Sequence, residues 1–135
     1  MTKHYIGTKE ILAWKQDKDD KPGYAVQYPD GYISWSPKDV FEDAYRVTEG
    51  DDQALTFGDA LHFLKLGYKL QRRGWNGDGL TIELQRPDGH SKMTLPDIFL
   101  SYPPSAIGAI STPGFRGPWF VSQTDLLAED WQIVE

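Results

Sequence analysis

The chain has 135 residues, 39% hydrophobic and 25% charged, which favours one compact domain, or a small domain with an appendage. A formal net charge of -6 argues against a protein that coats DNA or RNA, because that task needs a basic face to neutralise many phosphates. The absence of cysteine excludes disulfides and thiol catalysis, and we see neither a membrane-spanning apolar run nor a signal peptide, so we expect a cytosolic protein.

The beginning of the chain predicts strands. Residues 5–13 are expected to form one strand, and the charged segment 16–22 is expected to be a solvent-exposed loop. Residues 23–28 and 32–35 flank a Pro-Asp-Gly sequence at 29–31, where a proline and a glycine occupy the positions that a tight turn needs. These two runs therefore predict a β-hairpin.

A helix is expected directly after this hairpin. Ser36 is the expected N-cap, and Pro37 occupies the first helical position, where its missing N–H costs nothing. Asp39 lies in the first turn, where a carboxylate faces the positive end of the helix.

The segment 48–53, TEGDDQ, is polar and acidic and predicts a domain boundary. We expect an N-terminal module over residues 1–50, built as strand, hairpin and helix. A second domain over residues 54–135 is expected to run helix, strand, strand, loop, helix, strand. The predicted fold class is α+β, with a small antiparallel sheet and short helices.

The second domain is predicted to open with an amphipathic helix. Thr56 is its expected N-cap with Asp59 at the third position, and Gly67 ends it because glycine readily adopts a left-handed conformation. The apolar residues of this helix fall on one face: Phe57, Ala60, Leu61 and Leu64.

The remaining elements alternate between short strands and loops. Strands are expected over residues 68–72, 80–84, 94–101 and 131–134. The segment 102–118 is rich in proline and glycine and is expected to be one long loop. A short helix is expected after it, with Ser122 as N-cap and Asp125 three residues later.

Catalytic and metal-binding patterns are weak. His4, His62 and His90 are scattered over different elements, without the spacing of a metal-binding pair. A triad of Ser122, His90 and Asp125 can be written down, but Ser122 already has a structural role as a helix cap and no nucleophile elbow is present. We therefore expect no catalytic residue, no metal and no cofactor.

Two tryptophans in irregular segments favour binding instead. Trp75 lies in a glycine-rich turn and Trp119 follows the proline-rich loop, and scaffolds commonly present ligand-contacting side chains on such segments. Two such indoles could sandwich a purine; the alternative is that both fill the edges of the core. Arg72 and Arg73 point to opposite faces of a strand, so at most one of them enters a site, and we take Arg73 as the candidate.

Polar residues near these tryptophans could complete a nucleotide pocket. Asn76, Gln123 and Asp125 could bond to ribose hydroxyls or base edges. The first backbone N–H groups of the helix after Ser122 could hold a phosphate.

Three sequence strings in the second domain carry a family resemblance. They are TFGDAL at residues 56–61, GWNG at 74–77 and PW-x-x-SQTDLLAEDW at 118–131. In these strings the chain resembles the phage family that includes the second described group of Thoeris anti-defence proteins. The resemblance covers residues 55–134.

The resemblance implies a small α+β protein that acts as a sponge. Such a protein would bind a cyclic nucleotide immune signal without cleaving it, as a homodimer or homotetramer in the cytoplasm of the infected bacterial host. The signal would be of the glycocyclic ADP-ribose type, and cyclic dinucleotides could occupy another site. The resemblance makes the expected ligand contacts Trp75, Asn76, Trp119, Ser122, Gln123 and Asp125.

The chain departs from the family pattern in two places. The loop at 101–117 has a different length or composition, and it could reshape the pocket. The first 50 residues resemble a separate short module of tailed phages without a known role. A phage structural or protein-interaction module, an enzyme acting on a cyclic nucleotide, and a sponge for another nucleotide are the alternatives.

Overall fold

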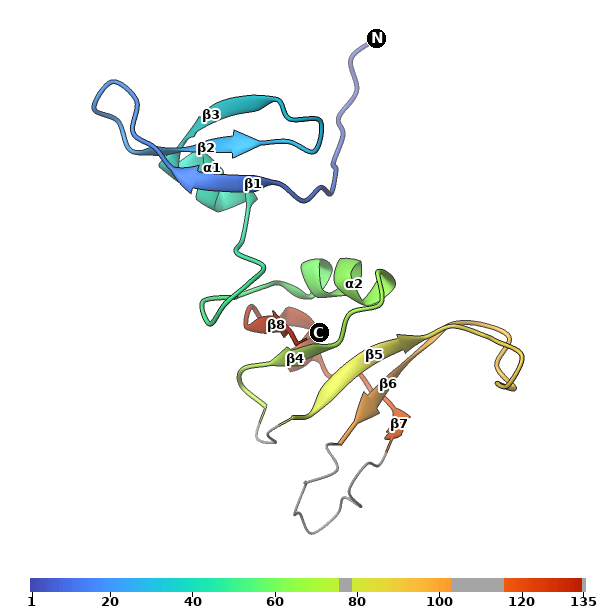
Figure 1. Ribbon diagram of the computed structural model, residues 1–135. Coiled ribbons are helices and arrows are strands. Elements are labelled where there is room, and N and C mark those ends of the chain that lie inside the picture. Colours follow the sequence, from blue (N-terminus) through green and yellow to red (C-terminus); the bar gives the residue numbers. More distant parts are fainter. Residues whose placement is uncertain (76–78, 103–115, 135) are drawn as a thin grey trace. The chain divides into compact units, whose positions relative to one another are not determined.

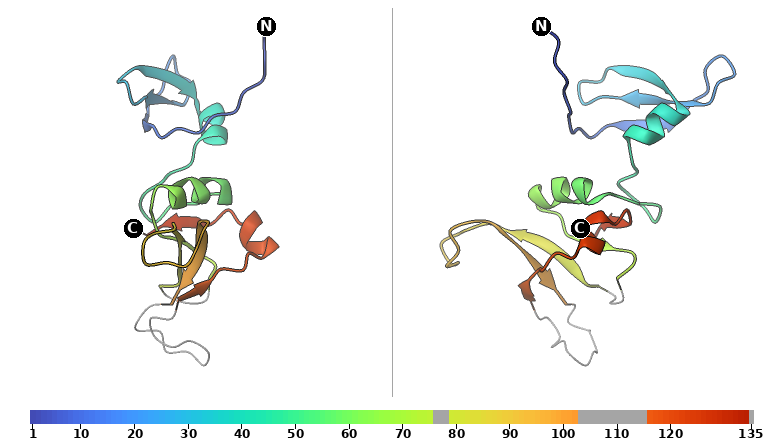
Figure 2. Two further views of the ribbon diagram at one scale, coloured as in Figure 1. Left: turned by 90° about the vertical axis from the view of Figure 1, so that its right-hand side faces the viewer. Right: turned by 180° about the vertical axis from the view of Figure 1, so that it is seen from behind.

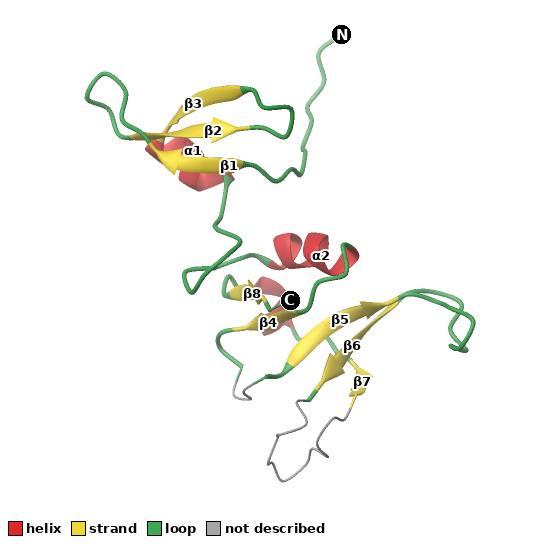
Figure 3. Cartoon of the chain, viewed as in Figure 1, coloured by secondary structure: helices red, strands yellow, loops and turns green. Residues whose placement is uncertain are grey.

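The computed structural model describes residues 1–75, 79–102 and 116–134, and the fold is α+β, as predicted (Figure 1, Figure 3). The chain divides into two compact units, Met1–Tyr45 and Arg46–Glu135. Each contains its own antiparallel sheet. No helix in the described ranges has the length and apolar character needed to span a membrane.

The N-terminal unit is a three-stranded antiparallel sheet with one helix. Its elements are β1 (Leu12–Lys15), β2 (Gly23–Gln27), β3 (Ile33–Pro37) and α1 (Lys38–Ala44), and the strand order is β1-β2-β3. The predicted hairpin is confirmed: Gly31 has φ +90°, and its N–H donates to the Tyr28 carbonyl at 2.8 Å. In the β1–β2 loop, Asp19 and Asp20 adopt positive φ between a reciprocally bonded Lys18 and Lys21, the geometry of a tight hairpin turn.

Two predictions for this unit are wrong. The strand expected over residues 5–13 is observed over Leu12–Lys15, so the two ranges share only residues 12 and 13; the preceding residues have no neighbouring strand to pair with in the described structure. Ser36 belongs to β3, and the residue that precedes the helix is Pro37, without a side-chain cap. The β-ladder extends to Pro37 opposite Gly23, so Ser36 is held in extended backbone instead of capping the helix.

The C-terminal unit is a five-stranded antiparallel sheet with two short helices (Figure 2). In chain order its elements are α2 (Phe57–Lys65), β4 (Leu70–Arg72), β5 (Thr81–Gln85), β6 (Asp97–Ser101), β7 (Arg116–Pro118), α3 (Gln123–Leu127) and β8 (Trp131–Ile133). The strand order is β7-β6-β5-β4-β8, so the last strand of the chain pairs with β4.

The capping residues predicted for the two helices are confirmed. Thr56 and Asp59 form a capping box, and Gly67 after α2 has φ +100°. Ser122 caps α3 by accepting the Asp125 N–H at 3.0 Å. The loop predicted over residues 102–118 is wrong at its end, where β7 pairs with β6; the proline is accommodated because β7 lies at the edge of the sheet.

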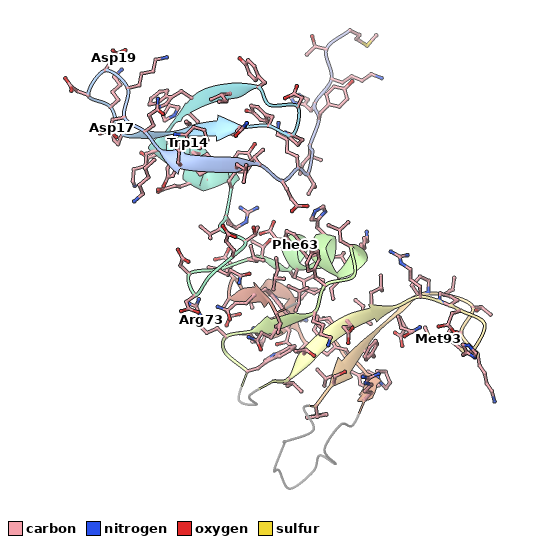
Figure 4. The ribbon with its side chains drawn as sticks, viewed as in Figure 1. Trp14, Asp17, Asp19, Phe63, Arg73 and Met93 are labelled. Carbon is pink, nitrogen blue, oxygen red and sulfur yellow. The ribbon has the colours of Figure 1, made fainter. Side chains whose placement is uncertain are left out.

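The core of the C-terminal unit lies between α2 and the sheet. Its members are fully or nearly fully buried: Leu55, Ala60, Phe63, Leu64, Leu70, Ile82 and Trp131. Phe63 projects from α2 in Figure 4. Gln53 is also buried, and its side-chain oxygen accepts the Ile133 N–H at 2.8 Å, so the end of the polar segment 48–53 is fastened to β8.

Candidate functional site

A buried indole supports both candidate tryptophans. Trp131, at the start of β8, is completely buried, and its indole N–H donates to the Asp125 carbonyl at 3.0 Å. The Trp75 ring meets the Trp131 ring edge to face, with 5.3 Å between centroids. The Trp119 ring does the same at 5.9 Å and also contacts Phe57 at 5.7 Å. Edge-to-face contacts of this kind are favourable, so the core fixes both outer indoles.

Trp75 and Trp119 line one open pocket of about 440 Å³. Both side chains are half-buried, so each packs against the core and also presents surface to the pocket. The other lining residues are Leu80, Leu100, Tyr102, Gly117, Pro118, Phe120 and Asp125. Leu80 directly precedes β5, Leu100 lies in β6, and Gly117 and Pro118 lie in β7; pairing of β6 with β5 and with β7 brings these residues together. Asp125 comes from α3.

Asp125 joins the pocket to a network of hydrogen bonds. One of its carboxylate oxygens accepts the Trp75 indole N–H at 3.0 Å and the Arg72 Nη1 at 2.8 Å. Arg72 also donates to Asp130 through Nε at 2.8 Å, and the Gly74 N–H donates to the other Asp130 oxygen at 2.9 Å. The turn that carries Trp75 is therefore held to α3 and to the residue before β8.

This arrangement keeps both carboxyl groups ionised. Partial burial opposes ionisation of Asp125, but hydrogen bonds from Arg72, Trp75 and Ser122 outweigh it, and the pKa of Asp125 is lowered. The pKa of Asp130 is lowered in the same way, by Arg72 and the Gly74 N–H against burial. The two carboxylates raise the pKa of Arg72 in turn, Asp130 more than Asp125.

The ion pair between Arg72 and Asp130 leaves little space around Gly74. A Cβ added at Gly74 would lie 2.9 Å from an Asp130 carboxylate oxygen and 3.1 Å from Arg72 Nη2. The absence of a side chain at this position lets the backbone approach the ion pairs.

The structure brings together some of the predicted site residues and separates others. Trp75, Trp119 and Asp125 line the same pocket. Ser122 lies beside it as the cap of α3, and Gln123 is exposed in the first turn of that helix. Asn76 falls outside the described residues.

Arg73 points elsewhere. Its guanidinium donates to the carbonyls of Asp51 at 2.6 Å and Gln53 at 2.9 Å. Arg73, labelled in Figure 4, is absent from the pocket lining. Of the two neighbouring arginines, Arg72 is the one that reaches Asp125. Successive side chains along a strand point to opposite faces, so this rule predicts that Arg72 and Arg73 diverge but not which of them lies on the side of the site.

Sequence reasoning did not select several residues that build the pocket. Leu100, Tyr102 and Phe120 line it, and Asp130 anchors the network behind it. Their contacts join positions far apart in the chain, such as Arg72 and Asp130, and no local motif signals such pairs. Trp131, which we predicted as part of a strand, is the common support of both outer indoles.

The chemistry of the lining suits a flat, largely apolar group. Among the lining residues that the structure describes, most side chains are aromatic or aliphatic, and Asp125 is the one carboxylate. No lysine or arginine is among the lining residues that the structure describes. The described part of the pocket can therefore stack a ring and accept hydrogen bonds, whereas the charge of an anionic ligand needs a partner from elsewhere.

The sequence of the C-terminal unit is similar to known phage proteins. The Thoeris anti-defense 2-like domain family matches residues 55–134. A relative named Thoeris anti-defense 2, from Bacillus phage SP01, is 35% identical over 89 residues, which is 59% of this chain and 94% of that relative. The family match includes every residue that lines the pocket.

Proposed function

The chain belongs to the Thoeris anti-defense 2-like family, and on that premise we propose that it binds and sequesters a cyclic nucleotide immune signal without cleaving it. Family membership supports an anti-defence role for a phage protein. The proposed ligand is of the glycocyclic ADP-ribose type, and cyclic dinucleotides are a second class to test. The proposed place of action is the cytoplasm of the infected bacterial host.

One observation carries this proposal: two indoles, both supported by Trp131, line the same pocket of about 440 Å³. Small-molecule sites usually measure about 300–1,000 Å³ and are mostly apolar, with a few polar groups. A base stacked on an aromatic ring gains about 1–3 kcal/mol, so two platforms would supply a substantial part of micromolar affinity. Indoles fixed in advance by the core also lose little conformational freedom on binding.

Sequestration without cleavage agrees with the state of Asp125. A general base needs a pKa near the working pH. The Asp125 carboxylate already accepts hydrogen bonds from Arg72 and Trp75, and its pKa is lowered. It is therefore a weak base, better suited to orienting Trp75 than to activating water.

The described lining of the pocket has no cation for the phosphates of the proposed ligand, and in the proposed assembly a second copy of the chain completes the site. Phe120 lines the pocket and is 85% exposed, and further exposed apolar side chains lie close to it in the chain, on and before α3: Val121, Leu126 and Leu127. An exposed apolar patch beside a pocket is typical of a subunit interface. We therefore include a homodimer or homotetramer in the proposal, with the phosphates held by groups outside the described lining.

The direct test is a thermal-shift panel with cyclic ADP-ribose isomers and cyclic dinucleotides on the purified chain. A ligand that binds the folded state raises the melting temperature by mass action. Stabilising ligands are then released by heat and identified by chromatography. Recovery of the intact ligand supports sequestration, and an altered ligand makes the protein an enzyme. Lack of any shift favours the alternative, a phage structural or protein-interaction module.

Variants of Trp75 test whether the pocket is the site. Trp75→Ala removes one platform and should abolish the ligand-induced shift, whereas Trp75→Phe keeps a ring but loses the hydrogen bond to Asp125 and should retain part of it. Trp14→Ala, a change of the same size in the N-terminal unit, is the matched control and should bind normally. If Trp75→Ala unfolds without ligand, the indole serves the core and the site assignment fails.

A further inference from the structure

The segment that precedes α2 lies along the outer edge of β8. The strand order puts β8 at one edge of the five-stranded sheet, and the backbone groups of an edge strand need partners from outside the sheet. Leu55 supplies them for Trp131, to which it is joined by an isolated antiparallel bridge. The Leu55 N–H donates to the Trp131 carbonyl at 3.0 Å, and the Trp131 N–H donates to the Leu55 carbonyl at 3.1 Å. We call residues 50–55 the strap.

A glutamine side chain continues this pairing at the next outward position of β8. Gln53 Oε1 accepts the Ile133 N–H at 2.8 Å, and Gln53 Nε2 donates to the Ile133 carbonyl at 3.4 Å. A primary amide has the same kinds of donor and acceptor as a peptide group, so the Gln53 side chain takes the place of a strand residue. Gln53 is 6% exposed, so loss of its amide would leave buried backbone groups of β8 without a partner.

Further hydrogen bonds hold the turn at the start of the strap. Gln53 Nε2 also donates to the Gly50 carbonyl at 3.1 Å, and Gly50 has φ +81°, a conformation that glycine adopts without strain. The Arg73 guanidinium donates to the carbonyls of Asp51 and Gln53. The Arg73 backbone N–H donates to the Asp130 carbonyl at 3.1 Å, directly before β8. Arg73 therefore connects the strap to the strands on which it lies.

The strap is in direct contact with the residue that supports the pocket. Both backbone groups of Trp131 bond to Leu55, and the Trp131 ring contacts the Trp75 and Trp119 rings, which line the pocket. Contacts of described residues therefore lead without a break from the strap through β8 to both indoles. Such a chain of contacts transmits a change only if one of its members has two states. The strap supplies them, because it can be bonded to β8 or released from it.

We propose that the strap positions the two pocket indoles, with Gln53 and Arg73 as positioning residues that do not touch the ligand. Neither residue belongs to the described pocket lining, and both segments of the strap that Arg73 contacts precede residue 55, where the family match begins. Residues 51, 52 and 54 are exposed, and segments with few buried contacts open at a lower free energy than the whole unit.

An attached strap favours binding, because indoles that are ordered in advance lose less conformational freedom when a ligand stacks on them. This link to affinity rests on the proposed function of the pocket. The positioning of the indoles does not, because it concerns the free chain.

Hydrogen exchange in the full chain without ligand tests the positioning role. Gln53→Leu keeps a side chain of similar size and removes the amide. We expect the Ile133 amide and the indole N–H groups of Trp75 and Trp131 to exchange about tenfold faster, the factor that about 1.4 kcal/mol of local stability gives. Gln85→Leu is the matched control: Gln85 lies on β5, its amide also donates a hydrogen bond, and it is outside the described pocket lining. It should leave these rates unchanged.

The Ile82 amide, in the interior of the sheet, separates positioning from a general loss of stability, and it should keep its rate in Gln53→Leu. Acceleration of the Ile133 amide alone would mean that the strap only closes the edge of the sheet. Equal acceleration of the Ile82 amide would mean that the strap only stabilises the whole unit. Either result, or unchanged rates, overturns the proposal.

Arg73→Met is the second variant, and it provides the same comparison if Gln53→Leu does not fold. It removes the bonds to the carbonyls of the strap but leaves the Gln53 amide on Ile133, so the same indole N–H groups should exchange faster, by a smaller factor. Indole rates equal to those of the wild type in this variant would exclude Arg73 as a positioning residue and overturn that part of the proposal.

A stabilising ligand, once identified, adds a separate readout. It should slow exchange of the Ile133 amide, and Gln53→Leu should weaken its binding, because coupling between two sites is reciprocal. The exchange rates of the free chain need no nucleotide, so failure of the proposed sequestration and failure of the positioning role give different results.

Discussion

The two units of this chain are stabilised in different ways. The C-terminal unit has a continuous buried core that includes Leu64, Leu70 and Trp131, each less than 2% exposed. The N-terminal unit relies on half-exposed aromatic pairs such as Tyr24 with Phe41 and Phe41 with Tyr45. A ligand pocket needs fixed walls, and such walls are present where a core holds them.

The largest expected effect comes from removing the support that both pocket indoles share. Trp131→Ala should destabilise the C-terminal unit by about 3–5 kcal/mol, because a large buried ring is lost and a cavity remains. The N-terminal unit should keep its own amide resonances in two-dimensional NMR spectra, since its core is separate. The control Trp14→Ala should leave the urea transition of the C-terminal unit unchanged. A single transition lost in both units at once would show that they do not fold independently.

The next effect concerns the ion pairs behind the pocket. Arg72 and Asp125 have side chains that are each 15% exposed, and Arg72→Met would leave two carboxylates close together without their cation. We expect a loss of about 2 kcal/mol in the free energy of unfolding at neutral pH, below the value for a fully buried pair because Asp130 is 28% exposed. Chemical denaturation of the full chain measures this loss, and ligand affinity should fall with it because Trp75 is no longer oriented.

The same pair predicts a pH dependence with a definite sign. The folded-state pKa values of Asp125 and Asp130 lie below their unfolded values, which are about 3.9. Their stabilisation is therefore complete above that pH and is lost as the pH falls through the lower folded-state values. Between about pH 5 and 2 the wild-type chain should lose more stability than Arg72→Met. Parallel pH profiles would contradict the assignment of these shifts to Arg72.

Sequence reasoning succeeded where the determining contacts are local. The Thr56–Asp59 capping box, the Ser122 cap and the turn at Gly31 each depend on residues within four positions, and all three are confirmed. The prediction of Ser36 as a helix cap failed. Ser36 lies in β3, where pairing with β2 holds its backbone in extended conformation. Local propensity gives way when a neighbouring strand supplies the backbone hydrogen bonds.

The candidate site could be predicted only in part for the same reason. The two tryptophans stood out because they lie in irregular segments, and the structure places both in one pocket. Which arginine reaches Asp125 depends on the pairing of β4 with β8, since Arg72 lies opposite Trp131 in the register. Pairing between strands about 60 positions apart has no local signature in a single sequence. The edge strand β7, formed from a Gly-Pro sequence, was missed because its residue types are depleted in strands.

The smallest effect is expected from an ion pair of similar chemistry in the other unit. Lys38 and Glu42 are 3.1 Å apart on α1, with side chains that are 49% and 43% exposed. Water already solvates both charges well, so their mutual attraction is largely offset by the ordering of two long side chains. Lys38→Met keeps most of the aliphatic stem, and we expect its melting temperature to match that of the wild type within error, at low and at high salt. Glu42 also accepts the Tyr24 hydroxyl at 2.7 Å, so it keeps a partner after the change.

A clear loss of stability from Lys38→Met, comparable to that from Arg72→Met, would mean that exposed surface contacts stabilise the N-terminal unit as strongly as buried pairs stabilise the C-terminal one. The contrast between the two units would then have to rest on core size alone.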